Sequence, residues 1–415
     1  MKRRKLLTVV IGICLVAGLV VGLPLLSGCR PAAPEAAKPI KIGAPDALTG
    51  PYAADGIFML NGTIMAAEEI NAEGGLLGRQ LEVVPFDIED MMAEKVMAAA
   101  ERLIGLDKVD VVITSCNAAG PDVEAFGNYD VPYLHYNATE PSVDLYLADP
   151  DTRFNVFMVG DVGDPYGAID FDVTQQLPYQ YPNKKLAAIK ADYQWDIEYV
   201  DGFRDRAIES GWEVVLEEVV PYGTSEWGPL LVKLRAENPS LIVASFYSAP
   251  DLVTLFRQWN EDPTDSILCF CYGVSIPEFA DMIGEEGNGI CGTAAAGILP
   301  TEEGRAWAER YEARFNEEAP KNASAGTCYD QVMAWAAAVR RVGDVTDYRA
   351  VCKALEDYPY EGLTGVYSFD NEHKVPESSS YPQHFFQMQN GDIVTLYVHL
   401  TPVSGTAFEL PPWLE

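Results

Sequence analysis

Basic side chains and histidines are scarce in this chain. Its 415 residues contain 29 Lys and Arg against 62 Asp and Glu, and only four His, which gives a formal net charge of −33. Residues 1–28 hold four basic and no acidic residues, so the remainder carries −37. A surface of that sign repels nucleic acid and anionic lipid headgroups. The balance therefore argues against a DNA- or RNA-binding role, and we expect no nucleic-acid partner.

Catalytic and metal-binding motifs are also missing. The sequence has no GxSxG nucleophile elbow, no GxGxxG and no GxxxxGK[ST] phosphate loop. None of the four histidines has HExxH spacing, and the cysteines lack zinc-site spacing. His135 ends a predicted strand beside the expected cleft, where a packed or surface side chain is favoured over a functional one. We therefore expect no enzyme, no catalytic residue, no metal and no cofactor.

The N-terminus reads as an export signal. A basic start, Lys2 to Lys5, precedes an apolar run over 6–26, and small residues Ser27-Gly28 lead to Cys29. The segment Leu-Ser-Gly-Cys resembles the bacterial lipobox, which implies a signal peptide over 1–28 and lipidation of Cys29. An uncleaved transmembrane anchor is the alternative, because the run approaches the ~20 residues that span a bilayer. Residues 29–39, the lipidated Cys and a Pro/Ala-rich stretch, are expected to form a tether.

About 375 residues remain, which favours two domains by length. Two cysteine pairings are expected from neighbourhood in an exported chain: Cys328 with Cys352, and Cys291 with Cys269 or Cys271.

Strand and helix patterns alternate twice along the chain. Repeated strand–helix units predict parallel sheets covered by helices on both faces, and a restart after residues 154–165 predicts two doubly wound α/β lobes. The first run has expected strands 41–44, 81–86, 109–114 and 132–135 with helices 57–72 and 91–105. The second has strands 186–191, 213–219, 241–246 and 266–271 with helices 200–210, 228–237 and 250–259. Long helices over 301–318 and 329–357 and a hairpin over 385–398 complete the prediction.

Ligands of open α/β sheets sit beyond the carboxyl ends of the strands. The segments to inspect are 46–55, 115–119, 136–139, 192–195, 247–251 and 272–275. Aromatic residues fall in or near them: Tyr193, Trp195, Tyr247, Tyr272 and Tyr329. Tyr and Trp combine a large apolar face with one hydrogen-bonding tip, which suits a small-molecule pocket, although each of these side chains could instead pack in the core.

The opening of the first lobe carries a resemblance. Leu48-Thr49-Gly50-Pro51-Tyr52, and Glu68-Glu69-Ile70-Asn71-Ala72-Glu73-Gly74-Gly75 with Gly78-Arg79, resemble the leucine/isoleucine/valine-binding family of type I periplasmic solute-binding proteins. The likeness runs from about 40 to 370 and includes Ser368-Phe369-Asp370, whereas the last 30 residues match poorly. It implies two lobes joined by a three-stranded hinge, the Venus flytrap. Lobe one would be 40–160 plus 298–380, and lobe two 161–297 plus 381–415.

The resemblance also implies a site. Asn117 and Ala118 stand where the family uses hydroxyls and backbone amides for a ligand carboxylate, and Asn137 and Thr139 lie in the next such loop. Lobe two would add Trp195, which closes over the ligand, and Tyr247 (or Ser248). Tyr329 matches a lobe-one aromatic near the cleft.

One departure concerns the ligand. Amino-acid binders of the family place a carboxylate in lobe two for the ligand ammonium, and that position falls on Tyr272. An unpaired buried ammonium is costly. Either Asp192, Asp196 or Asp251 takes over, or the ligand is no α-amino acid.

The resulting hypothesis is an extracytoplasmic, lipid-anchored monomer on the cell envelope. It captures a branched-chain amino acid or a related amino-acid-like compound and delivers it to an ABC permease with its ATPases. The alternatives are a binder of an amide, urea or aromatic acid for the same transporter class, a ligand-presenting sensory protein, an exported enzyme, or a structural envelope lipoprotein.

Overall fold

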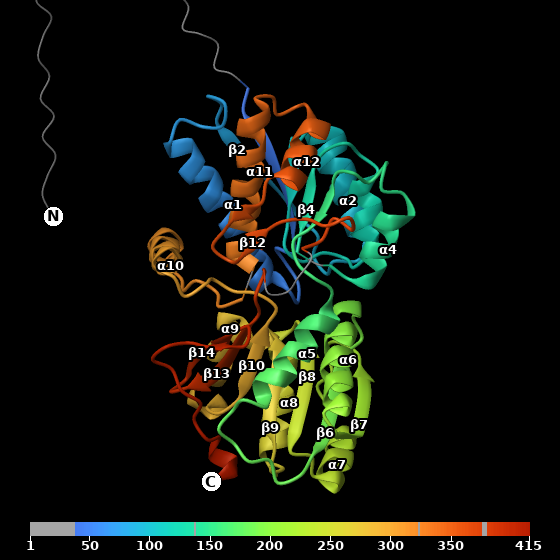
Figure 1. Ribbon diagram of the computed structural model, residues 1–415, viewed down its shortest axis with the longest axis vertical. Helices are drawn as coiled ribbons and strands as arrows, with labels where there is room; N and C mark the ends of the chain where they lie inside the picture. The colour runs from blue at the N-terminus through green and yellow to red at the C-terminus, as the bar shows by residue number, and fades with distance from the viewer. Residues whose placement is uncertain (1–37, 137, 323, 376–379) are drawn as a thin grey trace, which may run out of the picture. The chain divides into compact units, whose positions relative to one another are not determined.

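The computed structural model describes residues 38–136, 138–322, 324–375 and 380–415, which contain two α/β lobes (Figure 1). The predicted signal peptide, Cys29, most of the tether and Asn137 lie outside the described residues. Within those ranges, no helix is both long and apolar enough to cross a bilayer.

Lobe one is built on a parallel sheet of five strands in the order β2-β1-β3-β4-β5. The strands are β1 (Ile40–Asp46), β2 (Leu81–Asp87), β3 (Val111–Ile113), β4 (Tyr133–His135) and β5 (Val156–Met158). All nine residues of β3, β4 and β5 are buried, as expected of a parallel sheet covered on both faces.

Helices cover both faces of this sheet. Ile40 and Ile42 of β1 pack in one core with α1 and α11, whereas Val112 of β3 belongs to a second core with α2, α3 and α4. The bounds are α1 (Ala53–Ala72), α2 (Ala93–Ala100), η1 (Glu101–Asp107), α3 (Pro121–Gly127), α4 (Glu140–Ala148), α10 (Glu302–Phe315), α11 (Ser324–Val342) and α12 (Tyr348–Asp357). A short ribbon of β11 (Tyr360–Glu361) and β12 (Val366–Tyr367) follows.

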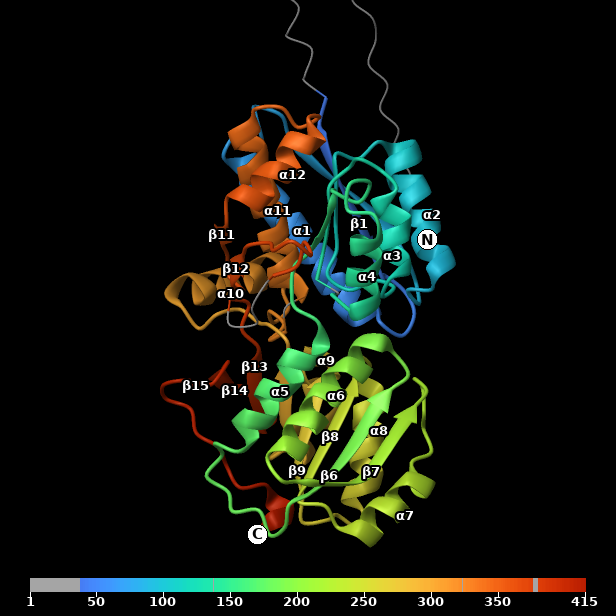
Figure 2. The ribbon, with the colours of Figure 1, turned by 45° about the vertical axis from the view of Figure 1, so that its right-hand side comes forward.

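Lobe two contains a mixed sheet in the order β15-β14-β13-β10-β9-β8-β6-β7 (Figure 2). β10, β9, β8, β6 and β7 are parallel, and β13, β14 and β15 add an antiparallel edge. The bounds are β6 (Lys185–Ala191), β7 (Glu213–Val220), β8 (Leu241–Phe246), β9 (Ile267–Tyr272), β10 (Cys291–Ala294), β13 (His384–Gln389), β14 (Asp392–Val398) and β15 (Thr401–Pro402).

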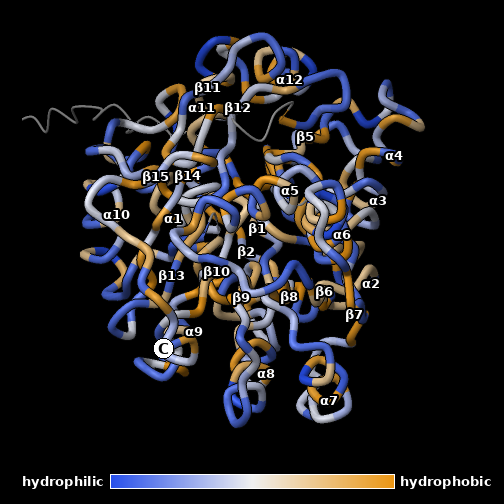
Figure 3. Tube along the Cα trace, turned by 60° about the horizontal axis from the view of Figure 1, so that its bottom comes forward, coloured by the Kyte–Doolittle hydropathy of each residue, from blue (hydrophilic) through white to orange (hydrophobic). Residues whose placement is uncertain are grey.

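Alternate residues of β6 explain how the second sheet is covered. Leu186 and Ala188 share a core with α5 and α6, whereas Ala187 and Ile189 pack with α7 and α8 on the opposite face. The helices are α5 (Gly163–Thr174), α6 (Gln194–Glu209), α7 (Gly228–Glu237), α8 (Ala249–Asn260) and α9 (Pro277–Ile283), with short turns η2 (Gly273–Ser275), η3 (Gly284–Gly287) and η4 (Pro412–Leu414). Figure 3 shows the hydrophobic colouring along β6 and β8 that this double burial requires.

The chain passes between the lobes three times: from β5 to α5, from β10 to α10, and from β12 to β13. All strands of the five-stranded sheet and the β11–β12 ribbon lie within 40–160 plus 298–380, and all strands of the eight-stranded sheet lie within 161–297 plus 381–415. The lobe bounds themselves stay a prediction.

Two sequence predictions were wrong. The helix expected over 329–357 is two helices, because Gly343 adopts φ 78° after α11 and α12 starts anew at an Asp347 cap. The expected disulfides are absent: all six cysteines within the described residues are free. Cys291 and Cys269 are register partners on neighbouring strands, but they pack in the core as small apolar side chains.

The predicted hairpin of 385–398 is confirmed as β13 and β14. Asn390 and Gly391 both have positive φ, 54° and 80°, as a two-residue turn between twisted strands requires.

Candidate ligand-binding site

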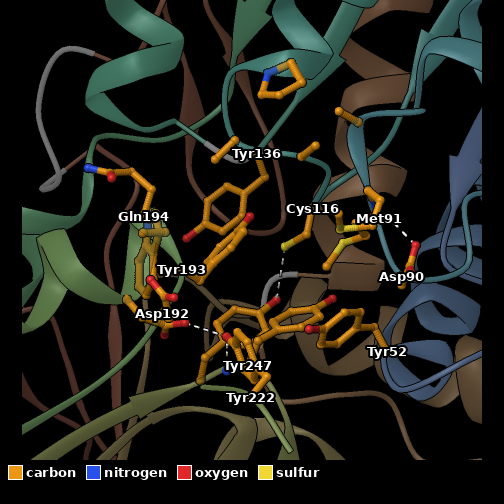
Figure 4. A pocket seen from close by; sticks show the side chains of 18 residues that line it. Tyr52, Asp90, Met91, Cys116, Tyr136, Asp192, Tyr193, Gln194, Tyr222 and Tyr247 are labelled. Carbon is orange, nitrogen blue, oxygen red and sulfur yellow. Dashed lines mark hydrogen bonds between the residues drawn. The ribbon is translucent and has the colours of Figure 1, made fainter. Parts of the chain in front are cut away.

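A cavity of about 420 Å³ lies beyond the carboxyl ends of strands from both sheets (Figure 4). This is where open α/β sheets bind ligands, and the volume suits a small molecule. The cavity is lined by Tyr52, Asp90, Met91, Met92, Ala93, Cys116, Ala118, Ala119, Pro121, Tyr136, Asp192, Tyr193, Gln194, Trp195, Asp196, Tyr222, Tyr247 and Tyr272.

Many of these side chains lie at or just after the end of a strand. In lobe one, Cys116 and Ala118 follow β3 and Tyr136 follows β4, while Tyr52 precedes the first turn of α1. In lobe two, residues 192–196 connect β6 with α6, and Tyr222 and Tyr247 follow β7 and β8. The last residue of β9, Tyr272, has φ 62° and ψ −65°, a strained backbone for a bulky residue.

Six of the aromatic rings form one continuous wall, which we call the aromatic wall. Each ring contacts the next, with centroids 6.4 Å apart for Tyr193–Tyr222, 5.8 Å for Tyr222–Tyr52, 5.2 Å for Tyr52–Tyr247, 5.0 Å for Tyr247–Tyr272 and 6.4 Å for Tyr272–Trp195. Most pairs are edge-on or tilted, the arrangements that aromatic quadrupoles favour. Tyr52 comes from lobe one and the other five from lobe two.

A buried carboxyl group stands behind this wall. Asp55, in the first turn of α1, accepts hydrogen bonds from the Tyr247 hydroxyl at 2.6 Å and the Tyr272 hydroxyl at 3.2 Å, and Asn322 Nδ2 donates to its other oxygen at 2.9 Å. Burial raises the pKa of Asp55, and these hydrogen bonds oppose the rise. Both tyrosines belong to lobe two, so Asp55 links the lobes.

A second carboxyl group supports the other end of the wall. Asp196 accepts from the Tyr222 hydroxyl at 2.5 Å and from Ser245 Oγ. Burial raises its pKa to about 6 against the effect of those two donors. Asp192, in contrast, is exposed at the rim of the cavity. Asp251 does not line the cavity; its carboxylate accepts from the backbone N–H of Gly223.

The residues predicted from sequence divide into two groups. Ala118, Trp195, Tyr247 and Tyr272 line the cavity. Asn117 and Thr139 are buried and are not among the lining residues: the Asn117 carbonyl accepts from the Tyr193 hydroxyl, and Thr139 caps α4.

Tyr329 is placed elsewhere. It lies on α11, its hydroxyl donates to Glu69 of α1 at 2.5 Å, and it does not line the cavity. Asn137 lies outside the described residues. His135 is fully buried and stacks on Tyr133.

Sequence reasoning did not select several lining residues: Tyr52, Cys116, Tyr136 and Tyr222. Three of them lie in segments flagged as strand ends, so position pointed to them but side-chain direction did not. Tyr222 follows β7, an edge strand whose end was not among those segments.

Cys116 supplies the one thiol among the described lining residues. Burial raises the pKa of the Cys116 thiol to about 12, which keeps it protonated and poorly nucleophilic. Across the described ranges, no three His, Cys, Asp or Glu side chains are grouped to hold a metal ion.

Comparison with known proteins gives this architecture a family. The sequence model of the periplasmic binding protein family matches residues 39–391. The leucine-, isoleucine-, valine-, threonine- and alanine-binding protein of Pseudomonas aeruginosa is 22% identical over 338 residues, 81% of this chain and 87% of that protein.

Two solved structures are also similar. One from Silicibacter pomeroyi, assigned to a branched-chain amino acid ABC transporter, has a TM-score of 0.80 and 29% identity, covering 91% of this chain and all of that one. A Rhodopseudomonas palustris ABC transporter solute-binding protein in complex with benzoate has a TM-score of 0.71 and 19% identity, covering 89% and 99%. The match to the family model covers most of the sequence, and this chain belongs to the periplasmic binding protein family.

Proposed function

We propose that the protein captures a small amino-acid-type solute outside the cytoplasm and delivers it to an ABC importer without chemical change. The observation that carries this proposal is the cavity itself, which is largely aromatic and is built from strand ends of both lobes. The names of the relatives, an amino acid-binding protein and parts of ABC transporters, support the same assignment.

Binding would act through the hinge. A ligand that touches Cys116 and Tyr136 of lobe one together with Trp195 and Tyr247 of lobe two gains contacts only when the lobes are together. It therefore shifts the hinge equilibrium toward closure by its differential affinity for the closed state. The membrane permease would recognise that closed form.

Asp192 is the best placed partner for a ligand ammonium. Tyr272 occupies the position where the resemblance led us to expect a carboxylate, and Asp196 and Asp55 already accept tyrosine hydroxyls. The Asp192 carboxylate lies at the rim and remains solvated. The Tyr136 hydroxyl is buried, and none of the described residues forms a hydrogen bond with it. It lines the cavity from lobe one and suits an acceptor group at the other end of the ligand.

An aromatic acid is the second candidate. The benzoate complex shows that this fold holds such a ligand, and the aromatic wall would stack against a ring. The charges oppose it: among the lining residues described there is no Lys, Arg or His to pair with a benzoate.

Export and anchoring complete the proposal. Lipidation of Cys29 would hold a monomer at the envelope membrane, with residues 30–39 as the tether. Labelling with a palmitate analogue would test it: wild type should carry the label and Cys29→Ala should not.

A thermal-shift screen of the chain from Pro31 onward tests ligand capture. The panel contains leucine, isoleucine, valine, threonine, methylated amino acids, amides, urea and benzoate, followed by calorimetry of each hit. A ligand at 100 times its Kd stabilises by about 2.7 kcal/mol, a readily measured rise in melting temperature. No stabilisation by any compound would contradict the proposed function.

A further inference from the structure

We propose that the aromatic wall holds an alkylated ammonium group, so that the ligand is a compact quaternary or tertiary ammonium compound carrying a hydrogen-bond acceptor at its other end. This inference rests on the proposed function and narrows its ligand class. It follows from the rings, the hydroxyl groups and the charges of the cavity.

The rings offer a continuous electron-rich surface. Five tyrosines and Trp195 are in contact one after another along the cavity. Figure 4 shows Tyr136 on the side of the cavity away from Tyr52, Tyr222 and Tyr247. The face of an aromatic ring is the negative side of its quadrupole, and several faces around one point form the cage that recognises quaternary ammonium ligands. The wall therefore supplies attraction to a cation that has no N–H to donate.

Four of the five tyrosine hydroxyl groups of the wall already donate hydrogen bonds within the protein. Those of Tyr222, Tyr247 and Tyr272 donate to Asp196 and Asp55, and that of Tyr193 donates to the Asn117 carbonyl. A donor committed to a carboxylate cannot also bind an anionic ligand. Donation to a carboxylate also leaves the phenol ring richer in electrons, which strengthens its attraction to a cation.

The charges have the same sign throughout. Asp90, Asp192 and Asp196 line the cavity. Asp55, which lies behind it, is not counted here, because burial raises the pKa of its carboxyl group. No basic side chain is present among the described lining residues. A cation entering the cavity thus meets attraction from several directions, and a ligand bearing only negative charge meets repulsion.

The chemistry of the wall favours alkylated over primary ammonium groups. A primary ammonium has three N–H donors, each of which needs an acceptor once it leaves water. The carboxyl oxygens of Asp55 and Asp196 already accept hydrogen bonds from hydroxyl and amide donors. Asp192 lies exposed at the rim of the cavity, away from the enclosed part of the wall. Methyl groups on nitrogen need no acceptor and bury apolar surface against the rings.

Lobe one supplies the contact for the opposite end of the ligand. The Tyr136 hydroxyl is buried, lines the cavity and has no hydrogen-bond partner among the residues that the structure describes. Buried polar groups are normally satisfied, so an unpaired hydroxyl in a cavity points to a ligand acceptor. A carboxylate or hydroxyl a few bonds from the ammonium would meet this need.

Calorimetry on the chain from Pro31 onward tests the inference with a matched pair of probes. Trimethylglycine carries the cation, and 3,3-dimethylbutanoate has the same shape with carbon in place of nitrogen. Choline and leucine complete the set. We expect trimethylglycine or choline to bind, and trimethylglycine to bind about three- to thirtyfold more tightly than its carbon analogue.

Variants at Tyr52 locate the effect in the wall. Tyr52→Leu removes one ring and Tyr52→Phe keeps it; the two should differ about tenfold in affinity for the ammonium probe and by less than threefold for the carbon analogue. Melting temperatures of both variants show whether each is folded.

Three outcomes overturn the inference. Equal affinities for trimethylglycine and its carbon analogue would mean that the positive charge of the ligand contributes nothing to recognition. Binding of leucine without either ammonium probe would refute the alkylated class and leave the proposed function intact. If neither these probes nor any compound of the thermal-shift panel bound, both the alkylated ligand class and the proposed function would be refuted.

Discussion

Trp195 is the residue with the largest apolar face in the cavity. It is 8% exposed, contacts Tyr272 at the end of the aromatic wall and stacks on Tyr199 beneath it. Trp195→Ala should weaken binding of the cognate ligand by about 1–3 kcal/mol through lost apolar contact. Calorimetry measures this loss of affinity. Trp413→Ala is the control, because Trp413 packs on Trp259 away from the cavity. An affinity equal to that of wild type would remove Trp195 from the site.

Asp46 predicts a pH dependence of stability. Burial raises its pKa to about 8, and the hydrogen bond from Thr114 Oγ1 at 2.8 Å only partly opposes this. Between about pH 4 and 8 the folded state therefore holds a proton that the unfolded state has lost, so this group's contribution to stability declines as pH rises through that window. Asp46→Asn, which stays neutral, should gain about 3–4 kcal/mol relative to wild type between pH 5 and 8.

Denaturant unfolding of both proteins at pH 5, 6, 7 and 8 measures this difference. Subtracting one curve from the other cancels the buried histidines, whose lowered pKa values act on both proteins alike. Parallel pH profiles would contradict a neutral Asp46.

The sequence could predict a site residue only where its position at the end of a strand is enough to place it near the ligand. Tyr247 and Tyr272 follow predicted strands, and the resemblance placed them near the ligand. Tyr329 is an example of what the backbone does not decide. It lies on a helix, where a shift of one residue changes the direction of the side chain, and its hydroxyl donates to Glu69 instead of entering the cleft. Asp55 was inside a flagged segment, but its role depends on tyrosines about 190 and 217 residues away.

Among the elements, the crossing of α1 and α11 depends on a close backbone approach. A Cβ on Gly62 of α1 would lie 2.0 Å from the carbonyl oxygen of Ala325 on α11. Gly62→Ala should therefore force the helices apart and destabilise the fold by about 2–4 kcal/mol. Gly105→Ala is the matched control: it is also a helical glycine, with nothing within 4 Å of the added Cβ, and should be neutral or slightly stabilising. Equal melting temperatures for the two variants would contradict this tight crossing.

Most helices and strands were predictable because a doubly wound fold has two strong sequence patterns, one for its strands and one for its helices. Buried parallel strands such as β8 are continuous apolar runs, and their helices carry a periodic apolar face. One error arose where a short connection changes the chain direction: the apolar pattern of α11 runs into that of α12, and only residues 343–347, which begin with Gly343 at positive φ, separate the two helices. Strand β5 lies at the sheet edge and has three residues, which are too few to show a strand pattern in the sequence.

For the whole molecule, the two lobes were predictable and their contact was not. Duplicated strand–helix runs indicated two lobes, and the family resemblance gave three crossings. The contact depends on side chains far apart in sequence, above all the hydrogen bonds of Tyr247 and Tyr272 to Asp55. These bonds exist only when the lobes are together, so they stabilise the closed form and not the open one.

Removing one of these bonds should make closure harder without changing the walls of the cavity. Tyr247→Phe keeps the ring and deletes the hydroxyl that donates to Asp55 at 2.6 Å, which leaves the buried carboxyl with fewer donors in the closed form. We expect the closed state to lose about 1–2 kcal/mol, and apparent ligand affinity to fall about five- to thirtyfold.

Small-angle scattering with calorimetry measures both effects. The variant should still contract when saturated with ligand, because the ligand contacts remain, but it should need more ligand to do so. Tyr397→Phe is the control, since Tyr397 lies on β14 outside the cavity and should leave affinity unchanged. If Tyr247→Phe bound and contracted like wild type, the bond between Tyr247 and Asp55 would contribute nothing to closure, and the aromatic contacts alone would hold the lobes together.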